Sequence, residues 1–192
     1  MKEVGLFFGS FNPVHVGHMV LANYMLEFTP MDELWFVVSP HNPLKEKSGL
    51  LDVRQRIQMV DLAIGGHPGM KSSSIETKLP QPSYTIHTLT HLSEKFPNFR
   101  FSLIMGSDNL ESLHKWKNYE QILNKHKIYV YPRPGHPGGQ FLSHRSVSLT
   151  SAPFIEISST FIREGIKAKL NMEYFVGSSV WSYLEEMNFY KK

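Results

Sequence analysis

The sequence contains no cysteine, no long apolar run and no strong excess of charge of one sign. Without cysteine, disulfide bridges, thiolate nucleophiles, iron–sulfur clusters and cysteine-ligated zinc are excluded. No stretch approaches the ~18 apolar residues that a membrane-spanning helix needs. The apolar start of the chain is too short and too interrupted for a secretory signal. We therefore expect a protein of a reducing compartment, the cytoplasm, with no membrane partner.

The charge balance is only slightly basic, because 20 Lys and Arg residues stand against 17 Asp and Glu residues. The basic residues are scattered and form no stripe of the kind that nucleic-acid binding needs. The 192 residues include 41% hydrophobic side chains, enough to build one buried core. The sequence therefore predicts a single domain over residues 1–192, with the helices from about residue 158 forming a subdomain. It leaves the oligomeric state open.

Apolar runs and segments of helical period alternate along the chain, which predicts strands and helices in alternation. The predicted strands are Val4–Phe8, Leu34–Val38, Phe101–Met105, Lys127–Tyr131 and Pro153–Ile157. Predicted helix starts are Asp52, which with Gln55 forms a capping box, Ser83 and Ser158. The glycine- and proline-rich segment 134–146 predicts a mobile surface loop. This order favours an α/β fold with a doubly wound, mostly parallel sheet and helices on both faces.

The densest motif is the segment from Gly9 to His18, directly after the first predicted strand. In a doubly wound sheet, ligands bind beyond the carboxyl ends of the strands. Gly9 permits a tight exit from the strand, and Gly17 leaves room above a helix N-terminus, where backbone N–H groups favour an anion. Two imidazoles, His15 and His18, can donate to phosphate oxygens and, as cations, offset the charge that develops during nucleotidyl transfer.

A metal site is the rival interpretation of this segment, since His15 and His18 could be two of its ligands. No neighbouring carboxylate or third histidine completes the set. The segment is no P-loop either, because it lacks the Gly-Lys-Ser/Thr ending. The sequence therefore predicts no protein-ligated metal here.

A second motif, Ile157 to Arg163, again lies where a predicted strand turns into a helix. Three hydroxyl residues, Ser158, Ser159 and Thr160, stand at the helix start, and Arg163 follows one turn later. Such a group of donors suits a polyphosphate. The alternative is an ordinary serine cap with a solvated arginine. Two anion-binding helix starts in one small domain favour the phosphate site.

Gly9–His18 resembles the Gly-x-Phe-x-Pro-x-His-x-Gly-His signature of the nucleotidyltransferase superfamily, and Ile157–Arg163 resembles its Ile-Ser-Ser-Thr-x-x-Arg partner. The residues between them are similar to bacterial nicotinate mononucleotide adenylyltransferases. This similarity lies in His41–Lys45, Ser83–Leu89, Met105–Leu110, Trp116 and Tyr131–Gly135. Pantetheine-phosphate adenylyltransferases share the two end motifs but lack the Ser-Tyr-Thr segment. Three residues depart from the pattern: Asn12 and His87 stand where Asp is frequent, and Ser107 where Ala is usual.

The resemblance implies a Rossmann-like fold with a small C-terminal helical part, and ATP and nicotinate mononucleotide as substrates. It implies transfer of the adenylyl group of ATP to the 5′-phosphate of the mononucleotide, with Mg²⁺ bridging the ATP phosphates rather than held by the protein. Other acceptors, nicotinamide mononucleotide or pantetheine phosphate, stay open as alternatives. So does a module that senses a nucleotide without turnover.

The resemblance also implies the roles of individual residues. The catalytic residues would be His15, His18 and Arg163. The ATP-binding residues would be Gly9, Ser10, Phe11, His15, His18, Gly106, Asp108, Ser158, Ser159, Thr160 and Arg163, with Asp108 accepting from a ribose hydroxyl. The acceptor-binding residues would be Lys45, Ser83, Tyr84, Thr85, Trp116 and Arg133. Trp116 would stack on the pyridine ring or, in the alternative, belong to the core.

Overall fold

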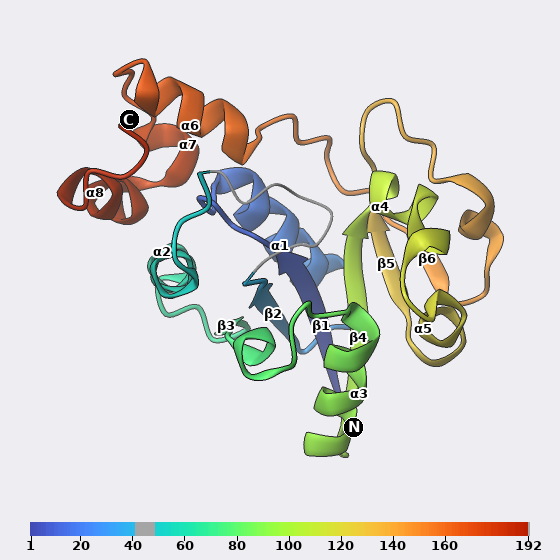
Figure 1. The fold of residues 1–192 in the computed structure, drawn as a ribbon. Coiled ribbons are helices and arrows are strands. Elements are labelled where there is room, and N and C mark those ends of the chain that lie inside the picture. The colour runs from blue at the N-terminus through green and yellow to red at the C-terminus, as the bar shows by residue number, and fades with distance from the viewer. Residues whose placement is uncertain (41–48, 192) are drawn as a thin grey trace.

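A computed structural model describes residues 1–40 and 49–191 of the chain. Within these ranges six strands form one sheet in the order β3-β2-β1-β4-β5-β6, and each strand runs parallel to its neighbours (Figure 1). The strand order reverses direction between β1 and β4, which makes that point the topological switch of the sheet. The predicted doubly wound parallel fold is confirmed.

The strands are β1 (Lys2–Gly9), β2 (Glu33–Val38), β3 (Met70–Ser73), β4 (Phe99–Gly106), β5 (Ile128–Tyr131) and β6 (Val147–Leu149). The α-helices are α1 (Val16–Phe28), α2 (Val53–Ile64), α3 (Thr85–Lys95), α4 (Ser107–Glu111), α5 (Tyr119–Lys125), α6 (Ser159–Lys167), α7 (Glu173–Val176) and α8 (Ser178–Glu186). Three short 3-10 helices are η1 (Ile75–Lys78), η2 (Leu113–Lys115) and η3 (Gly139–Ser143).

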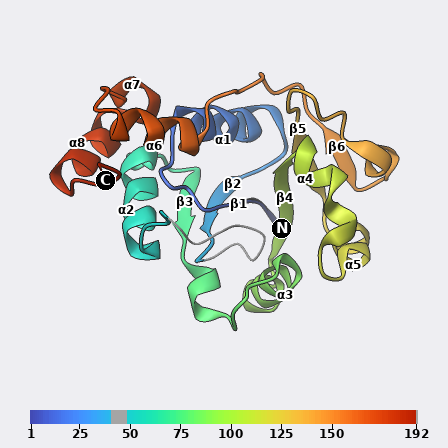
Figure 2. The same cartoon turned by 45° about the horizontal axis from the view of Figure 1, so that its top comes forward.

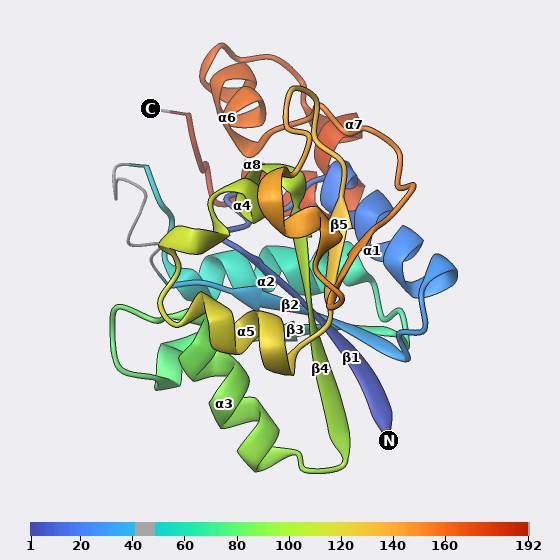
Figure 3. The same cartoon turned by 90° about the vertical axis from the view of Figure 1, so that its right-hand side faces the viewer.

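Both faces of the sheet are buried, and successive side chains of a strand enter opposite cores. Phe7 of β1 packs in the core beneath α1 and α2, whereas Leu6 packs in the core beneath α3 and α5. Figure 3 shows α1 and α3 on opposite sides of the strands. A strand buried on both faces has no polar side to display. This explains why the central strands read as continuous apolar runs.

The helices α6, α7 and α8 extend the first of these cores. Their side chains Ile162, Val176 and Leu184 belong to the same apolar cluster as Leu21 of α1 and Met59 of α2. The segment between β6 and α6 runs past α1 to reach them (Figure 2). Their standing as a separate subdomain stays a prediction. None of the described helices is both long enough and apolar enough to cross a membrane.

Two of the predicted elements are wrong. The segment Pro153–Ile157 pairs with no strand of the described sheet; the last strand is instead Val147–Leu149. Proline lacks the N–H that a ladder needs, and this segment leaves the sheet to reach α6. Ser83 does not cap α3, whose N-cap is Tyr84. The short edge strand β3 escaped prediction because its polar residues, such as Lys71, give no apolar run.

Two helix starts are confirmed, but the capping box of Asp52 with Gln55 is wrong, because Asp52 accepts from Arg54 rather than from Gln55. Asp52 caps α2 by accepting from the Arg54 N–H at 2.8 Å, and Ser158 caps α6 by accepting from the Phe161 N–H at 3.1 Å. The segment 134–146 was predicted as a mobile loop, but it contains η3 and is tied to α4. The carboxylate of Glu111 accepts from the Gly138 N–H at 3.1 Å.

The carboxyl end of the sheet is organised around one buried cation, Arg56 of α2, which is 1% exposed. Its guanidinium donates to the carbonyl oxygens of Ser10 at 2.7 Å, Ser39 at 2.8 Å, Pro40 at 3.1 Å and Leu51 at 2.9 Å. These carbonyls belong to three segments, which other hydrogen bonds also connect, such as that from the Ser39 N–H to the Gly9 carbonyl at 2.9 Å. A buried carbonyl without a donor costs the full loss of its hydration. Arg56 therefore joins the loop after β1, the end of β2 and the start of α2.

We expect Arg56→Met to lower the free energy of unfolding by about 3–5 kcal/mol, because four partly buried carbonyls lose their donor together. Urea denaturation measures the change. Arg54→Met, on the same helix but exposed, is the matched control and should shift stability by no more than about 0.5 kcal/mol. Equal stabilities of the two variants would show that Arg56 does not hold these segments together.

Candidate active site

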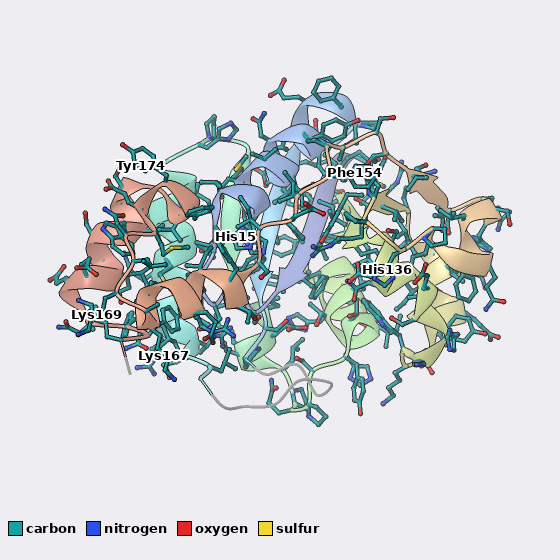
Figure 4. The ribbon with its side chains drawn as sticks, turned by 90° about the horizontal axis from the view of Figure 1, so that it is seen from above. His15, His136, Phe154, Lys167, Lys169 and Tyr174 are labelled. Atoms are coloured by element: carbon teal, nitrogen blue, oxygen red, sulfur yellow. The ribbon has the colours of Figure 1, made fainter. Side chains whose placement is uncertain are left out.

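A cavity of about 670 Å³ opens at the carboxyl ends of β1 and β4, where the topological switch lies. Seen from above, His15 lies near the middle of this end of the molecule (Figure 4). Most of the residues singled out from the sequence line this one cavity. They are Gly9, Ser10, Phe11, His15, His18, Ser83, Tyr84, Thr85, Asp108, Trp116, Arg133, Ser158, Ser159, Thr160 and Arg163. Gly106 lies beneath Asp108 rather than in the cavity wall, and Lys45 lies outside the described residues.

The first loop leaves β1 through a left-handed turn at Phe11, whose φ is 46°. This backbone conformation is uncommon for an aromatic residue and needs support from its surroundings. The ring of Phe11 is buried between those of Phe7, Phe36 and His18, at centroid distances of 5.8, 5.4 and 5.0 Å. A methyl group on Gly9 would stand 2.8 Å from the Phe11 ring, so only glycine fits there.

The two histidines of the loop stack, with ring centroids 3.7 Å apart. The Nδ1 atom of His18 accepts from the backbone N–H of His15 at 3.2 Å. Because Nδ1 is an acceptor, the ring proton of His18 lies on Nε2. A methyl group on Gly17 would stand 2.5 Å from Ile155 Cγ2 and 3.0 Å from His15 Nδ1, so glycine lets the Ile155 segment and the His15 ring approach this turn.

His15 is buried, and its Nδ1 has no hydrogen-bond partner among the described residues. Burial, and then the charge of Arg133, lower the pKa of His15 from 6.5 to about 4. The sequence suggested that both imidazoles act as cations. In the site as it stands, His15 is neutral at pH 7.

The second motif is bonded directly to the first. Ser159 Oγ donates to the carbonyl of Pro13 at 2.8 Å, and Arg163 Nη1 donates to the carbonyl of Asn12 at 2.9 Å. Arg163 Nη2 also donates to Thr160 Oγ1 at 3.2 Å. The two segments lie 146 and 151 positions apart in these contacts, yet together they form one wall of the cavity.

The strand β4 ends at a cluster built from Ser107, Asp108 and Arg133. Ser107 Oγ is buried and accepts from the Arg133 N–H at 2.9 Å, which gives a structural reason for serine at this departure from the resembled pattern. Asp108 Oδ1 and Arg133 Nε stand 3.8 Å apart, and neither atom has a hydrogen bond among the described residues. A side chain at Gly106 would collide with the Asp108 carboxylate.

Aromatic and cationic side chains form the opposite end of the cavity. Trp116 is half-buried, packs against the core beneath α3 and also lines the cavity. The Nζ atom of Lys117 lies 4.6 Å from the ring centroid of Tyr84. Glu76, which is buried, lines the same end and accepts from Thr88 Oγ1 at 3.0 Å.

His87, one of the three departures from the family pattern, is exposed and does not line the cavity. Its ring packs edge-on against that of Tyr84 at 5.5 Å. It therefore touches the site only through the back of Tyr84.

Sequence reasoning missed several residues of the cavity wall or its support, namely Ser39, Glu76, Asn109, Ser112, Lys115, Lys117, Arg56 and Tyr190. The only signal at hand was the pair of lysines beside Trp116. Among residues 1–40 and 49–191, no three histidine, aspartate or glutamate side chains stand close enough together to hold a metal ion.

A family model described as cytidylyltransferase-like matches residues 6–165. A relative from Flavobacterium psychrophilum, named "probable nicotinate-nucleotide adenylyltransferase", is 55% identical over 192 residues, covering 99% of this chain and 100% of the relative. A relative of the same name from Bacteroides thetaiotaomicron is 45% identical, covering 96% of this chain and 91% of the relative.

Solved structures give the same fold. The nicotinic acid mononucleotide adenylyltransferase of Plasmodium falciparum complexed with NaAD superposes with a TM-score of 0.82 at 17% identity, covering 100% of this chain and 98% of the other. The same enzyme complexed with APC gives a TM-score of 0.80 at 18% identity, with the same coverage. At such identities the likeness concerns the fold alone, whereas the sequence relatives define the family. The chain belongs to the cytidylyltransferase-like family, and within it to the nicotinate-nucleotide adenylyltransferases.

Proposed function

We propose that this protein transfers the adenylyl group of ATP to the 5′-phosphate of nicotinate mononucleotide. The products are nicotinic acid adenine dinucleotide and pyrophosphate, a step of NAD biosynthesis. Its relatives carry the name of this activity over their full length. The cytoplasmic location of the reaction stays a prediction.

One observation carries the proposal. Three buried side-chain atoms lack a hydrogen-bond partner in the described part of the chain, His15 Nδ1, Asp108 Oδ1 and Arg133 Nε, and all three residues line the same cavity. Buried polar atoms are almost always paired in folded proteins. Unpaired donors and acceptors gathered in one cavity are suited to a polar, charged ligand such as a nucleotide.

The reaction is a direct displacement at the α-phosphorus of ATP. An oxygen of the acceptor phosphate forms a bond to that phosphorus while the bond to the bridging oxygen breaks, and pyrophosphate leaves with the electron pair. The acceptor phosphate is already anionic, so no general base is required. Catalysis then consists of positioning and of stabilising negative charge.

The residues divide this work between them. His18, which presents Nε2–H, and His15 stabilise the charge of the transferring phosphoryl group. Arg163, with the hydroxyls of Ser159 and Thr160 beside it, holds the departing pyrophosphate. Asp108 accepts from the adenosine ribose, the usual use of an acid after a strand of such a sheet.

The site suits Mg²⁺ that enters bound to ATP rather than Mg²⁺ held by protein side chains. When bound, it would neutralise charge on the phosphate oxygens, which supply its ligands together with water. The cavity wall includes two acidic residues, Asp108 and Glu76, and Glu76 is already bonded to Thr88. The side chains of Arg163 and His18 supply the protein's own contribution of positive charge and donors.

The acceptor end of the cavity favours an acidic pyridine. Lys115 and Lys117 line it, and Lys117 is held over the ring of Tyr84. A pyridine carboxylate is an acceptor only, so it pairs with ammonium groups and backbone N–H donors, whereas the carboxamide brings an NH₂ that those donors oppose. Trp116 stacks on the pyridine ring in this arrangement.

A pyrophosphate-release assay with ATP and a panel of acceptors tests the function. The panel contains nicotinate mononucleotide, nicotinamide mononucleotide and pantetheine phosphate. We expect kcat/KM for the nicotinate acceptor to exceed the others by ~10² or more, since unpaired donors penalise the amide. Turnover of either other acceptor alone would reassign the enzyme, and ATP binding without any turnover would indicate a sensor module.

We expect His18→Asn and His18→Ala to lower kcat by ~10² to 10³, the usual effect of losing one donor to a developing charge. Asparagine places its amide oxygen near the position of Nδ1 and can keep the bond to the His15 N–H, so it removes Nε2 with little change in the loop. Steady-state kinetics with thermal unfolding as a control measures this. Wild-type kcat in the asparagine variant would exclude His18 from catalysis.

ATP binding should be accompanied by proton uptake at His15. The pKa of about 4 keeps His15 neutral at pH 7, and adjacent phosphate charge raises a histidine pKa. The bound state then holds more protons than the free state, so ATP binds more tightly as pH falls from 8 to 6. Calorimetry in buffers of different ionisation enthalpy measures the uptake, and His15→Asn should remove it. An equal uptake in wild type and variant would contradict this role.

Removing the charge of Lys117 should weaken the preference for the acid. We expect Lys117→Met to lower the ratio of kcat/KM for nicotinate over nicotinamide mononucleotide by roughly two- to fivefold, the effect of one exposed charge contact of ~0.5–1 kcal/mol. Lys95→Met is the matched control, because Lys95 also lies over an aromatic ring, that of Phe96, but away from the cavity. An unchanged ratio in the Lys117 variant would show that Lys117 does not contribute to the preference for the acid.

A further inference from the structure

The segment after α8 folds back onto the loop that follows β1. Asn188 and Tyr190 both adopt left-handed backbone conformations, with φ of 53° and 62°. The Phe189 N–H donates to the Leu184 carbonyl at 3.1 Å and closes the turn. A left-handed conformation is uncommon for tyrosine, so contacts elsewhere must hold it. This turn directs the side chain of Tyr190 toward the first loop.

The hydroxyl of Tyr190 donates to Asn12 Oδ1 at 2.6 Å, across 178 positions of the chain. Asn12 is buried, and its side chain makes two further bonds: Oδ1 accepts from the Leu51 N–H at 3.3 Å, and Nδ2 donates to the Gly49 carbonyl at 2.9 Å. The side chain thus uses both its acceptor and its donor. An aspartate, frequent here in the family, would have no donor for Gly49, which gives a structural reason for asparagine in this chain.

Asn12 links this contact to the site through its own backbone. Its carbonyl accepts from Arg163 Nη1 at 2.9 Å, so the orientation of Asn12 sets one of the two anchors of that guanidinium. Burial raises the pKa of the Tyr190 hydroxyl, while the nearby charges of Arg163 and Arg56 oppose this rise. The phenol stays protonated at neutral pH and remains a donor to Asn12.

We propose that Tyr190 is a positioning residue for adenylyl transfer: its hydroxyl fixes Asn12, and through the Asn12 carbonyl it orients Arg163 toward the ATP phosphates. The inference rests on the proposed function for the role of Arg163, and on two hydrogen bonds for the path, from Tyr190 to Asn12 and from Arg163 to Asn12. The ring of Tyr190 packs beside Phe189 at a centroid distance of 6.3 Å. The ring of Tyr190 makes the packing contacts and its hydroxyl makes the bond to Asn12, so a substitution that removes only the hydroxyl tests positioning without removing the packing.

Tyr190→Phe removes the hydroxyl and keeps the ring. We expect kcat/KM for ATP to fall roughly tenfold or more, because small misplacements of a catalytic group cost up to ~10² in rate. The KM for the acceptor should change less than twofold. Tyr183→Phe is the matched control, since this hydroxyl on α8 has no hydrogen bond among the described residues and its ring packs against Phe189. The control should keep wild-type kinetics.

A second variant separates positioning from mere stability. Arg163→Lys keeps the charge but loses the forked geometry that lets one guanidinium hold both Asn12 and a phosphate. If Tyr190 acts through Arg163, adding Tyr190→Phe to Arg163→Lys should cost less than half of its effect in the wild-type background on a logarithmic scale. Wild-type kinetics in Tyr190→Phe, a lowered melting temperature alone, or full additivity with Arg163→Lys would each overturn the proposal.

The same variants distinguish failure of this inference from failure of the proposed function. If wild type releases no pyrophosphate with nicotinate mononucleotide, the adenylyl-transfer assignment fails. The affinity for ATP, measured by calorimetry, then tests the role of Tyr190. Weaker ATP binding in Tyr190→Phe, with wild-type affinity in Tyr183→Phe, supports the positioning role. Equal affinities in the two variants overturn it.

Discussion

The geometry of this site depends on the guanidinium of Arg56. Three loops meet where the strands end, and each brings carbonyl oxygens into a place that water reaches poorly. One side chain with five N–H donors in a fixed fork can satisfy several carbonyls at once, and Arg56 does so for Ser10, Ser39, Pro40 and Leu51. The Ser10 carbonyl directly precedes the left-handed turn at Phe11, so its bond to Arg56 supports the phosphate loop at that turn.

The cavity wall differs from its support in that some of its buried polar atoms lack hydrogen bonds within the described part of the chain. Arg56 in its support donates to four carbonyls, whereas His15, Asp108 and Arg133 each have a buried polar atom with no hydrogen-bond partner among the described residues. Burial also keeps His15 neutral, so the empty cavity carries less positive charge than its histidine content suggests. A polyanion that enters would supply acceptors for these groups and raise the pKa of His15 at the same time. Binding and charge compensation are thereby coupled.

Much of the fold and the two phosphate motifs could be predicted from the sequence, because both are local. A strand buried on both faces must be apolar along its length, and Ser158 must precede α6 to cap it. The strand β3 was missed because it is short and polar. The segment at Pro153 was wrongly predicted as a strand, because its apolar residues resemble one although proline lacks the N–H that a ladder needs. The individual roles of the site residues and the subdomain division stay predictions.

The supporting contacts were invisible for a different reason. The residues next to Arg56 and Tyr190 in the sequence do not indicate which groups these side chains bind. Their hydrogen-bond acceptors depend on which loops the strand order brings together. The bond from Tyr190 to Asn12 spans 178 positions. The family motifs contain the residues that face the substrates. They do not show which distant residue supports them, such as Tyr190 for Asn12.

The central claim is that both substrates meet in one cavity and react in a single displacement, with no residue of the protein carrying the adenylyl group. The configuration at phosphorus tests it directly. ATP bearing a chiral thiophosphate at the α-position should give a dinucleotide with inverted configuration, because one in-line attack inverts the centre. Retention of configuration would require two displacements through a covalent enzyme intermediate and would contradict the account.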